Sequence, residues 1–412
     1  MMDRVAGRRS ERRLPRRSGS RAPLCRGLKP AVTSPTHLPG GTFGSRQKNP
    51  RLRTEPMACG LQSAVRSGAG GVDREASRCG TMMNSGHLAN GPEGYGAIRE
   101  GAAWARLPER TVLTASGRDA VRFLDGFTTA AVSRLACGGG TEGFLADARG
   151  WVIALVDLVR EADGVRLEAG PGLGHRLLTH LEHFHIREDV SLVDVSPART
   201  TFVVVGPETP AWLERHVGVA MPEHVLDHHP AVVADGAAAI VRTDWYGMPG
   251  VRIQVASDVG ERTAAWLATT GLPLASTAAI DTARIEAGNP EPHDIPDKTL
   301  PQELDRDARA ISFTKGCYLG QETVARIDAL GHANRRLVAL ACRDPLPGAG
   351  VMLEAESIGT VTSACRSPRL EHGLALAIIH VRGLEAGARL TVSGSDARVV
   401  PFPARLGGGT QA

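Results

Sequence analysis

Two hydrophobic periods alternate along the chain from about residue 110, one typical of strands and the other of helices. Period-two and continuous apolar runs predict strands at 111–116, 142–147, 151–159, 165–168, 190–195, 201–205, 238–243 and 251–255. Apolar residues at helical spacing predict a short helix after Asp119 and further helices over 173–184, after Pro210 and over 258–269. Strands and helices in this mixed order indicate an α+β fold.

The pattern changes near residue 333. Short alternating strands, separated by Gly, Pro and Asp turns, follow at 337–342, 351–354, 358–364, 374–381, 389–393 and 397–400. Such a series is typical of a small antiparallel barrel. We therefore expect the C-terminal part of the chain to form a β-barrel domain of its own.

One further helix is predicted over residues 278–288. Gly288 suits the position just past the end of a helix, and Asn289-Pro290 stops it. The Pro-rich connection that follows, NPEPHDIPDKTLPQEL, argues against regular structure. It must therefore be held in place by contacts with the rest of the protein.

The charge is divided unevenly along the 412 residues. Residues 1–82 carry 17 Lys and Arg against 5 Asp and Glu, so the net charge of +4 leaves the remainder at −8. Residues 1–85 are rich in Arg, Gly, Ser and Pro, which predicts a disordered basic tail. Three explanations stay open for it: a mis-set start codon ahead of Met82 and Met83, an arm attracted to nucleic acid or membrane, and an organelle transit peptide.

Seven cysteines are present, and none forms a C-x-x-C pair. An odd number without metal-ligand spacing argues against both a disulfide framework and a zinc site, so no metal is expected. It also argues against a cluster held by four cysteines of this chain. A reducing, cytoplasmic setting fits best. No apolar run is long enough to span a membrane, and the acidic body carries no RNA-binding signature.

Cys317 has the local context of a reactive thiol. It follows Gly316, lies two residues from Lys315 and precedes a helix predicted from Leu319. A nearby cation and a helix N-terminus both lower the pKa of a thiol. The residues alone leave two hypotheses, a reactive or ligand-facing thiolate and a buried cysteine that packs under the loop.

The segment Lys315-Gly316-Cys317-Tyr318-Leu319-Gly320-Gln321-Glu322 resembles the signature of YgfZ-type folate-binding proteins. Its flanks agree, with R-I-E-A-G at 284–288, P-Q-E at 301–303 and I-G-T-V-T-S at 358–363. The wider superfamily includes the T-protein of the glycine cleavage system, an aminomethyltransferase that uses tetrahydrofolate.

The resemblance implies a three-domain, aminomethyltransferase-like fold around a central folate site. On this basis, residues 86–199 and 278–333 form a first, folate-binding domain and residues 200–277 an α+β second domain. Residues 334–412 form the C-terminal barrel. Reduced folate, tetrahydrofolate, is the expected cofactor.

The resemblance also implies which residues form the site. Cys317 and Lys315 are the candidate catalytic residues, and the candidates for folate contact are Arg284, Glu286, Trp245, Tyr246, Arg252 and Gln321. Aromatic walls and Arg forks suit a flat pterin and a glutamate carboxylate.

Two departures count against aminomethyl transfer. Ala154 and Leu155 stand where the T-protein carries two carboxylates, and Arg252 stands where it carries the Glu that meets the pterin. A proton cannot be transferred by a carboxylate that is missing.

Three functions remain. The first is a tetrahydrofolate-binding accessory protein for assembly or repair of iron–sulfur clusters in client enzymes, including tRNA-modifying ones. It would not contact nucleic acid or membrane directly. The second is a folate-dependent aminomethyl or methyl transferase, and the third a non-catalytic, folate-regulated scaffold. Substitution of Cys317 separates the first from the third.

Overall fold

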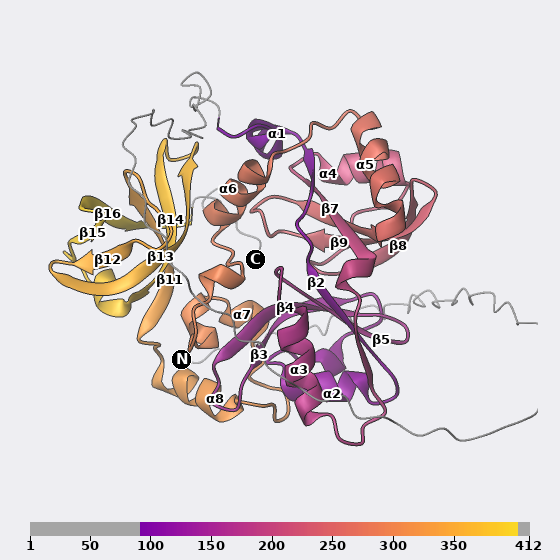
Figure 1. The fold of residues 1–412 in the computed structure, drawn as a ribbon, viewed down its shortest axis with the longest axis horizontal. Coiled ribbons are helices and arrows are strands. Elements are labelled where there is room, and N and C mark those ends of the chain that lie inside the picture. Colours follow the sequence, from indigo (N-terminus) through magenta and orange to yellow (C-terminus); the bar gives the residue numbers. More distant parts are fainter. Residues whose placement is uncertain (1–90, 403–412) are drawn as a thin grey trace, which may run out of the picture. The chain divides into compact units, whose positions relative to one another are not determined.

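The structure is a computed structural model that describes residues 91–402, so the tail predicted at 1–85 and the end of the last domain lie outside the described residues. Two five-stranded antiparallel sheets and a closed six-stranded barrel form its framework (Figure 1). Each strand predicted from period-two alternation is present within a few residues of its expected bounds.

The first sheet has the strand order β3-β4-β5-β2-β6. Its strands are β2 (Thr111–Ser116), β3 (Gly140–Ala146), β4 (Val152–Arg160), β5 (Gly164–Ala169) and β6 (Ser191–Asp194). Helices α2 (Ala120–Phe127) and α3 (Gly174–Phe184) pack on one face, where Leu124 and Leu177 join Leu145 and Leu158 in a buried cluster. Because successive side chains of a strand point to opposite faces of the sheet, every second residue of β4 faces away from α2 and α3.

The second sheet has the order β1-β7-β10-β9-β8. Its elements are β1 (Ala103–Arg106), β7 (Arg199–Val205), β8 (His228–Val233), β9 (Gly236–Thr243) and β10 (Gly250–Ala256), with helices α4 (Thr209–Val217) and α5 (Gly260–Thr269). Sequence patterning did not predict β1 or β8. Both are edge strands, and β8 contains Pro230, which an edge tolerates because no ladder hydrogen bond is lost there. Because β1 pairs with β7, residues 103–106 belong to this sheet and not to the first.

The barrel closes in the order β11-β14-β13-β12-β15-β16. Its strands are β11 (Arg335–Cys342), β12 (Gly350–Leu353), β13 (Glu356–Ser367), β14 (His372–His380), β15 (Leu390–Val392) and β16 (Ser395–Val400). Closure leaves no unpaired strand edge. The barrel predicted from the sequence is confirmed.

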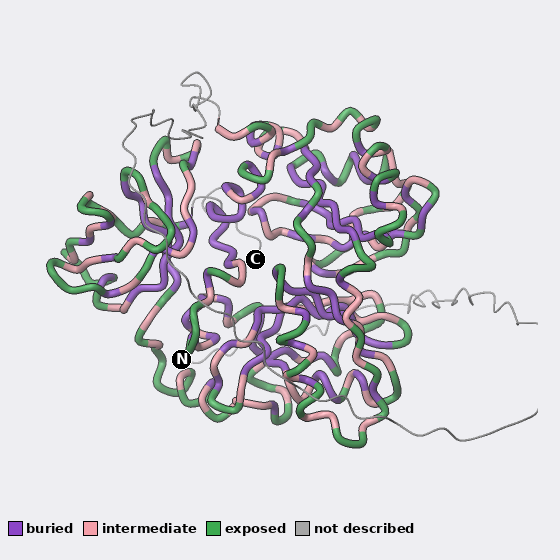
Figure 2. The backbone as a smooth tube through the Cα atoms, in the orientation of Figure 1, coloured by how far each residue is buried: buried purple, intermediate pink, exposed green. Residues whose placement is uncertain are grey.

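Helix α6 (Thr277–Ala287) is buried along most of its length, between α1 (Tyr95–Glu100) and the barrel (Figure 2). The Ser276 side chain caps its start by accepting from the Ala279 backbone N–H. Gly288 ends it with φ of 73°, as predicted, and a Cβ there would lie 2.4 Å from the Phe402 ring. Gly288 is therefore required by both its backbone angle and its packing.

The Pro-rich connection after α6 contains two short 3-10 turns, Pro292–Asp294 and Pro301–Leu304, and then helix α7 (Asp307–Ala310). Asp294 is fully buried and accepts from Arg284 of α6 at 2.8 Å and from Ser363 of β13 at 2.7 Å. Contacts of this kind hold the connection in place, as the composition predicted. Helix α8 (Gln321–Leu330) follows and leads into the barrel.

Candidate functional site

A row of three carboxylates crosses the face of the first sheet that is turned away from α2 and α3. Asp157 on β4 stands opposite Glu142 on β3 and opposite Glu168 on β5. All three residues are buried, at 4%, 7% and 1% exposure for Glu142, Asp157 and Glu168. Like charges side by side in a dry sheet repel, so cations must compensate them.

Arginines supply that compensation, some of them from other elements. Arg306 donates to both oxygens of Glu142, at 2.7 and 2.5 Å. Arg252, on β10 of the second sheet, donates to Asp157 at 2.6 Å and lies 3.4 Å from Glu168. Arg166 on β5 lies 3.3 Å from Glu168. The charge row therefore joins the two sheets.

Burial and neighbouring charges shift the pKa values of the groups in this row to different extents. Burial opposes ionisation of Glu168, yet Arg252 and Arg166 outweigh it and lower the pKa of Glu168 to about 2. Burial raises the pKa of Asp157, although the positive charge of Arg252 opposes this shift. The pKa of Arg252 is raised, because Glu168 and Asp157 outweigh the effect of its burial.

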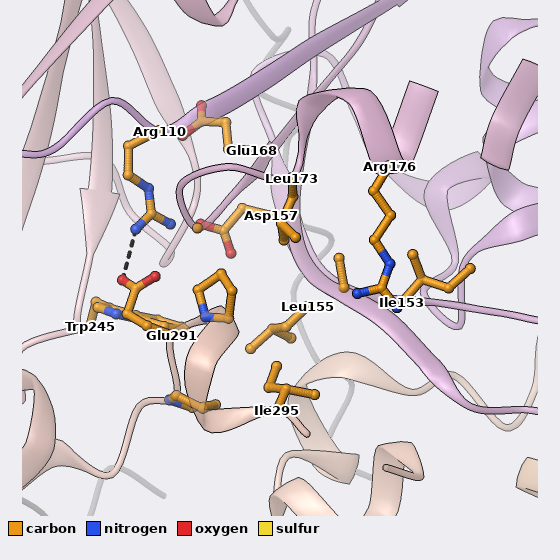
Figure 3. Close-up of a pocket in the computed structure, with 14 residues that line it drawn as sticks. Arg110, Ile153, Leu155, Asp157, Glu168, Leu173, Arg176, Trp245, Glu291 and Ile295 are labelled. Atoms are coloured by element: carbon orange, nitrogen blue, oxygen red, sulfur yellow. Dashed lines mark hydrogen bonds and ion pairs between the residues drawn. The ribbon is translucent and has the colours of Figure 1, made fainter. Parts of the chain in front are cut away.

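A small cavity of about 40 Å³ lies against the middle of this row (Figure 3). Asp157 and Glu168 line it together with Leu155 and its neighbours on β4, and Trp245 and Glu291 close it from the other side. The indole Nε1 of Trp245 is buried and has no hydrogen-bond partner among the described residues. Ala154 and Leu155, the positions where carboxylates were expected to be lost, also line this cavity.

A larger pocket of about 270 Å³ adjoins the cavity, and the two share Arg110 and Glu291. These two side chains form an ion pair at 2.9 Å, with exposures of 11% and 16%. Apolar residues, among them Leu107 and Ile280, make up much of the outer wall, and Tyr246 lines it too. The Arg110–Glu291 pair is therefore a polar partition between an inner and an outer chamber.

Arg284 and Glu286, which were predicted to contact folate, are engaged inside the protein. The Arg284 guanidinium donates to Asp281, Asn289, Asp294 and Ser363, each at 2.7 to 2.9 Å. Glu286 accepts from Tyr95 at 2.7 Å and from Ser367 at 2.6 Å. Both tie α6 to the barrel. Arg284 also borders the outer pocket.

The aromatic candidates lie where the two chambers meet. Trp245 is in the loop between β9 and β10, with the Arg306 guanidinium 5.0 Å from its ring centre. Tyr246, beside it, is buried, and burial raises its pKa to about 12. The hydroxyl therefore stays protonated at neutral pH and can donate a hydrogen bond.

The segment around Cys317 is anchored by Lys315. The Lys315 ammonium donates to the Thr128 carbonyl at 2.9 Å and the Ala130 carbonyl at 2.6 Å, and lies 3.5 Å from the Asp125 carboxylate. Burial lowers the pKa of this amine. Lys315 therefore fastens the loop to the end of α2. Cys317 is exposed, and Gln321 begins α8.

The structure thus brings some predicted residues together and not others. Trp245 lines the inner chamber, Tyr246 and Arg284 line the outer one, and Arg252 holds Asp157 in place. Cys317, Lys315, Glu286 and Gln321 line neither chamber.

The sequence analysis missed Arg110, Asp157, Glu168 and Glu291. Asp157 did leave a signal, a single carboxylate inside the apolar run VIALVDLVR. A charge within a buried strand indicates either a paired ion or a functional site.

The cysteines differ in their surroundings, which predicts an order of thiol reactivity. Burial raises the pKa of Cys342 to about 11 and that of Cys365 to about 12, whereas Cys317 and Cys137 are exposed. We expect Cys317 to alkylate faster between pH 6 and 9 than Cys137, Cys342 or Cys365, with Cys137 the nearest competitor of these three, because the thiolate is the reactive form. Mass spectrometry after timed iodoacetamide treatment measures the order. Equal rates for Cys317 and Cys365 would contradict it.

Within residues 91–402 there is no group of three or more His, Cys, Asp or Glu side chains arranged to hold a metal ion. The same part of the chain contains no helix long and apolar enough to span a bilayer.

Comparison with protein families gives two matches, one after the other along the chain. Residues 94–315 match the GCVT N-terminal domain, and residues 335–405 match the glycine cleavage T-protein C-terminal barrel domain. Among solved structures, aminomethyltransferase T of the glycine cleavage system from Bartonella henselae is similar, with a TM-score of 0.67 at 20% identity. The similarity covers 75% of this chain and 88% of that one. The predicted T-protein-like α+β fold with a C-terminal barrel is confirmed.

Curated relatives divide between two groups. An aminomethyltransferase from Nostoc sp. is 29% identical over 52% of this chain, which spans 57% of that relative's length. The tRNA-modifying protein YgfZ from Cronobacter sakazakii is 30% identical over 71% of this chain and 91% of its own length. The human mitochondrial iron–sulfur cluster assembly factor IBA57 is 29% identical over 81% of this chain and 96% of its own. By its two domains and these relatives, the chain belongs to the superfamily of the glycine cleavage T-protein, as a YgfZ-type member.

Proposed function

We propose that this protein binds a reduced folate and serves as an accessory protein for the assembly or repair of iron–sulfur clusters. Its clients would be iron–sulfur enzymes, tRNA-modifying enzymes among them. The observation that supports folate binding is the pair of adjoining chambers walled by Trp245, Tyr246 and Arg110. The names of the YgfZ and IBA57 relatives support the cellular role.

The chemistry of the two chambers suits the parts of a folate. The inner one offers an indole wall and a carboxylate, which suit the flat, N–H-rich pterin. The outer one offers an apolar wall, which suits the benzoyl linker, and Arg110, which suits a carboxylate. The unpartnered Trp245 Nε1 is a buried donor that a ligand would satisfy.

Entry of a ring requires a change at the partition. A cavity of about 40 Å³ holds little more than a water molecule, whereas ligand sites span roughly 300–1,000 Å³. Parting the Arg110–Glu291 ion pair joins the inner cavity to the outer pocket of about 270 Å³. We therefore expect folate binding to be accompanied by movement of these two side chains.

The residues that line the inner cavity do not favour the alternative function, which is aminomethyl or methyl transfer. Ala154 and Leu155 present apolar groups where the T-protein carries carboxylates. Cys317, on an exposed loop outside both chambers, provides a thiol that could act on a client or on a one-carbon unit. The scaffold hypothesis would apply if that thiol proves dispensable.

The compartment stays a prediction. The cysteine content favours a reducing cytoplasm, but the human relative is a mitochondrial protein by name.

Calorimetric titration tests the folate proposal directly. The wild-type chain should bind tetrahydrofolate with micromolar affinity, about −8 kcal/mol, and should gain thermal stability on binding. p-Aminobenzoic acid, which lacks both the pterin and the glutamate, serves as the control and should bind far more weakly. If tetrahydrofolate gave no heat of binding and no shift of the melting temperature, the proposal would be contradicted.

A further inference from the structure

Asp157 differs from the other two carboxylates of the row in how it is neutralised. Glu142 faces both Arg306 and Arg309, and Glu168 lies between Arg166 and Arg252. Asp157 stands between the two other carboxylates and ion-pairs with Arg252 through one oxygen, Oδ2, at 2.6 Å. The middle of the row is therefore its least compensated position.

Asp157 is also the member of the row that opens most to the inner cavity. Its side chain is 10% exposed, against 3% for Glu142 and 0% for Glu168. Figure 3 shows its carboxylate pointing toward the space between Glu291, Arg110 and Leu155. Leu155, two residues earlier on β4, lies on the same face of the strand and supplies an apolar floor.

A carboxylate placed in this way has a defined ligand chemistry. Its two oxygens offer about four lone-pair sites, of which Arg252 occupies one. The Arg252 contact fixes its direction and leaves it able to accept two parallel hydrogen bonds. A fused 2-amino-pyrimidinone ring presents adjacent N–H and amino donors with that geometry, and Trp245 provides a wall for such a ring.

We propose that Asp157 is the carboxylate that recognises the N–H and amino donors of the pterin ring, acting from a strand position two residues beyond the apolar Ala154-Leu155 pair. This inference rests on the proposed folate binding. It assigns a specificity role to a residue outside the signature motif, and it involves no covalent step. Arg252 is then a positioning residue for Asp157.

The decisive experiment compares Asp157→Asn with the wild-type full-length chain against three ligands. These are tetrahydrofolate, 6-methyltetrahydropterin, which is the pterin alone, and p-aminobenzoylglutamate, which has no pterin. The variant should bind the first two about 10- to 100-fold more weakly, because a hydrogen bond to a charged group is replaced by one to an amide. Its affinity for p-aminobenzoylglutamate should stay within about threefold of the wild-type value.

Glu303→Gln is the matched control. Glu303 is a buried carboxylate paired with Arg335, and it lines neither chamber. Its substitution should lower stability without changing the affinity for any of the three ligands. Asp157→Asn binding tetrahydrofolate as tightly as wild type, or losing p-aminobenzoylglutamate equally, would overturn the inference.

One further measurement uses the wild-type chain, so its outcome does not depend on whether the variant folds. A tetrahydrofolate analogue that lacks the 2-amino group should bind at least about tenfold more weakly than tetrahydrofolate, because one donor to the carboxylate is gone. Equal binding would overturn the role of Asp157 but leave folate binding intact. Absence of tetrahydrofolate binding by the wild-type chain would overturn the proposed function itself.

Discussion

Cys317→Ser is expected to abolish rescue of iron–sulfur enzyme activity in cells that lack the native protein. Cys317 is exposed on a loop that Lys315 fastens to the end of α2, so its thiol is available to a client while its position is held. Serine is nearly the same size but is a far weaker nucleophile near neutral pH. The melting temperature and the affinity for tetrahydrofolate should stay unchanged, because Cys317 lines neither chamber.

Cys137→Ser is the matched control, since Cys137 is also exposed. It should restore the activity of the iron–sulfur enzymes as well as the wild type does. Activity of an iron–sulfur client enzyme in extracts, normalised to the amount of each variant, measures the difference. Full rescue by Cys317→Ser would show that this thiol is dispensable and would favour the folate-regulated scaffold.

Glu142→Gln is expected to lower the free energy of unfolding by about 3–5 kcal/mol, the cost of leaving a buried charge without its partner. The Glu142 and Arg306 side chains are 3% and 1% exposed, and Arg306 donates to both carboxylate oxygens. Removing the negative charge leaves Arg306 buried without an anion beside it. Urea denaturation at pH 7, followed by circular dichroism, measures the change.

Asp244→Asn provides the comparison for that experiment. Asp244 pairs with Arg309 at 2.9 Å, but both side chains are about two-fifths exposed, at 42% and 39%. Solvent screens such a pair, so its loss should cost less than about 1 kcal/mol. If Glu142→Gln cost no more than Asp244→Asn, the charge row would not be the stabilising link that its geometry indicates.

Local sequence determined most of the elements. The short apolar segments 337–342 and 374–381 predicted β11 and β14, and both strands are buried on both faces, with alternate residues in two different core clusters. Gly288 likewise ended its helix as predicted, since few other residues adopt its left-handed backbone angle. Strands β1 and β8 were missed, because neither A-W-A-R nor H-H-P-A-V-V alternates between apolar and polar residues, and Pro230 counts against a strand.

The candidate site was predicted less completely, for a different reason. Arg284 and Glu286 looked suited to folate from their residue types and motif, but nearly all their polar atoms bind other parts of this chain. Asp157 lies 15 residues after Glu142 and 11 residues before Glu168 in the sequence. The three side chains meet only because β3, β4 and β5 pair in one register. No periodicity indicates which charges will face each other across strands.

Sequence alone therefore determined the order of most elements and the barrel, since each depends on residues close together in the chain. It left open whether Cys317 is buried, and only the structure shows this residue exposed. Only the tertiary structure decided which charges are buried and what they contact. The energy of a buried charge depends on every group within a few ångströms, and for Asp157 those groups come from β3, β5 and β10. The partition between the chambers is also tertiary, because Arg110 and Glu291 are 181 residues apart.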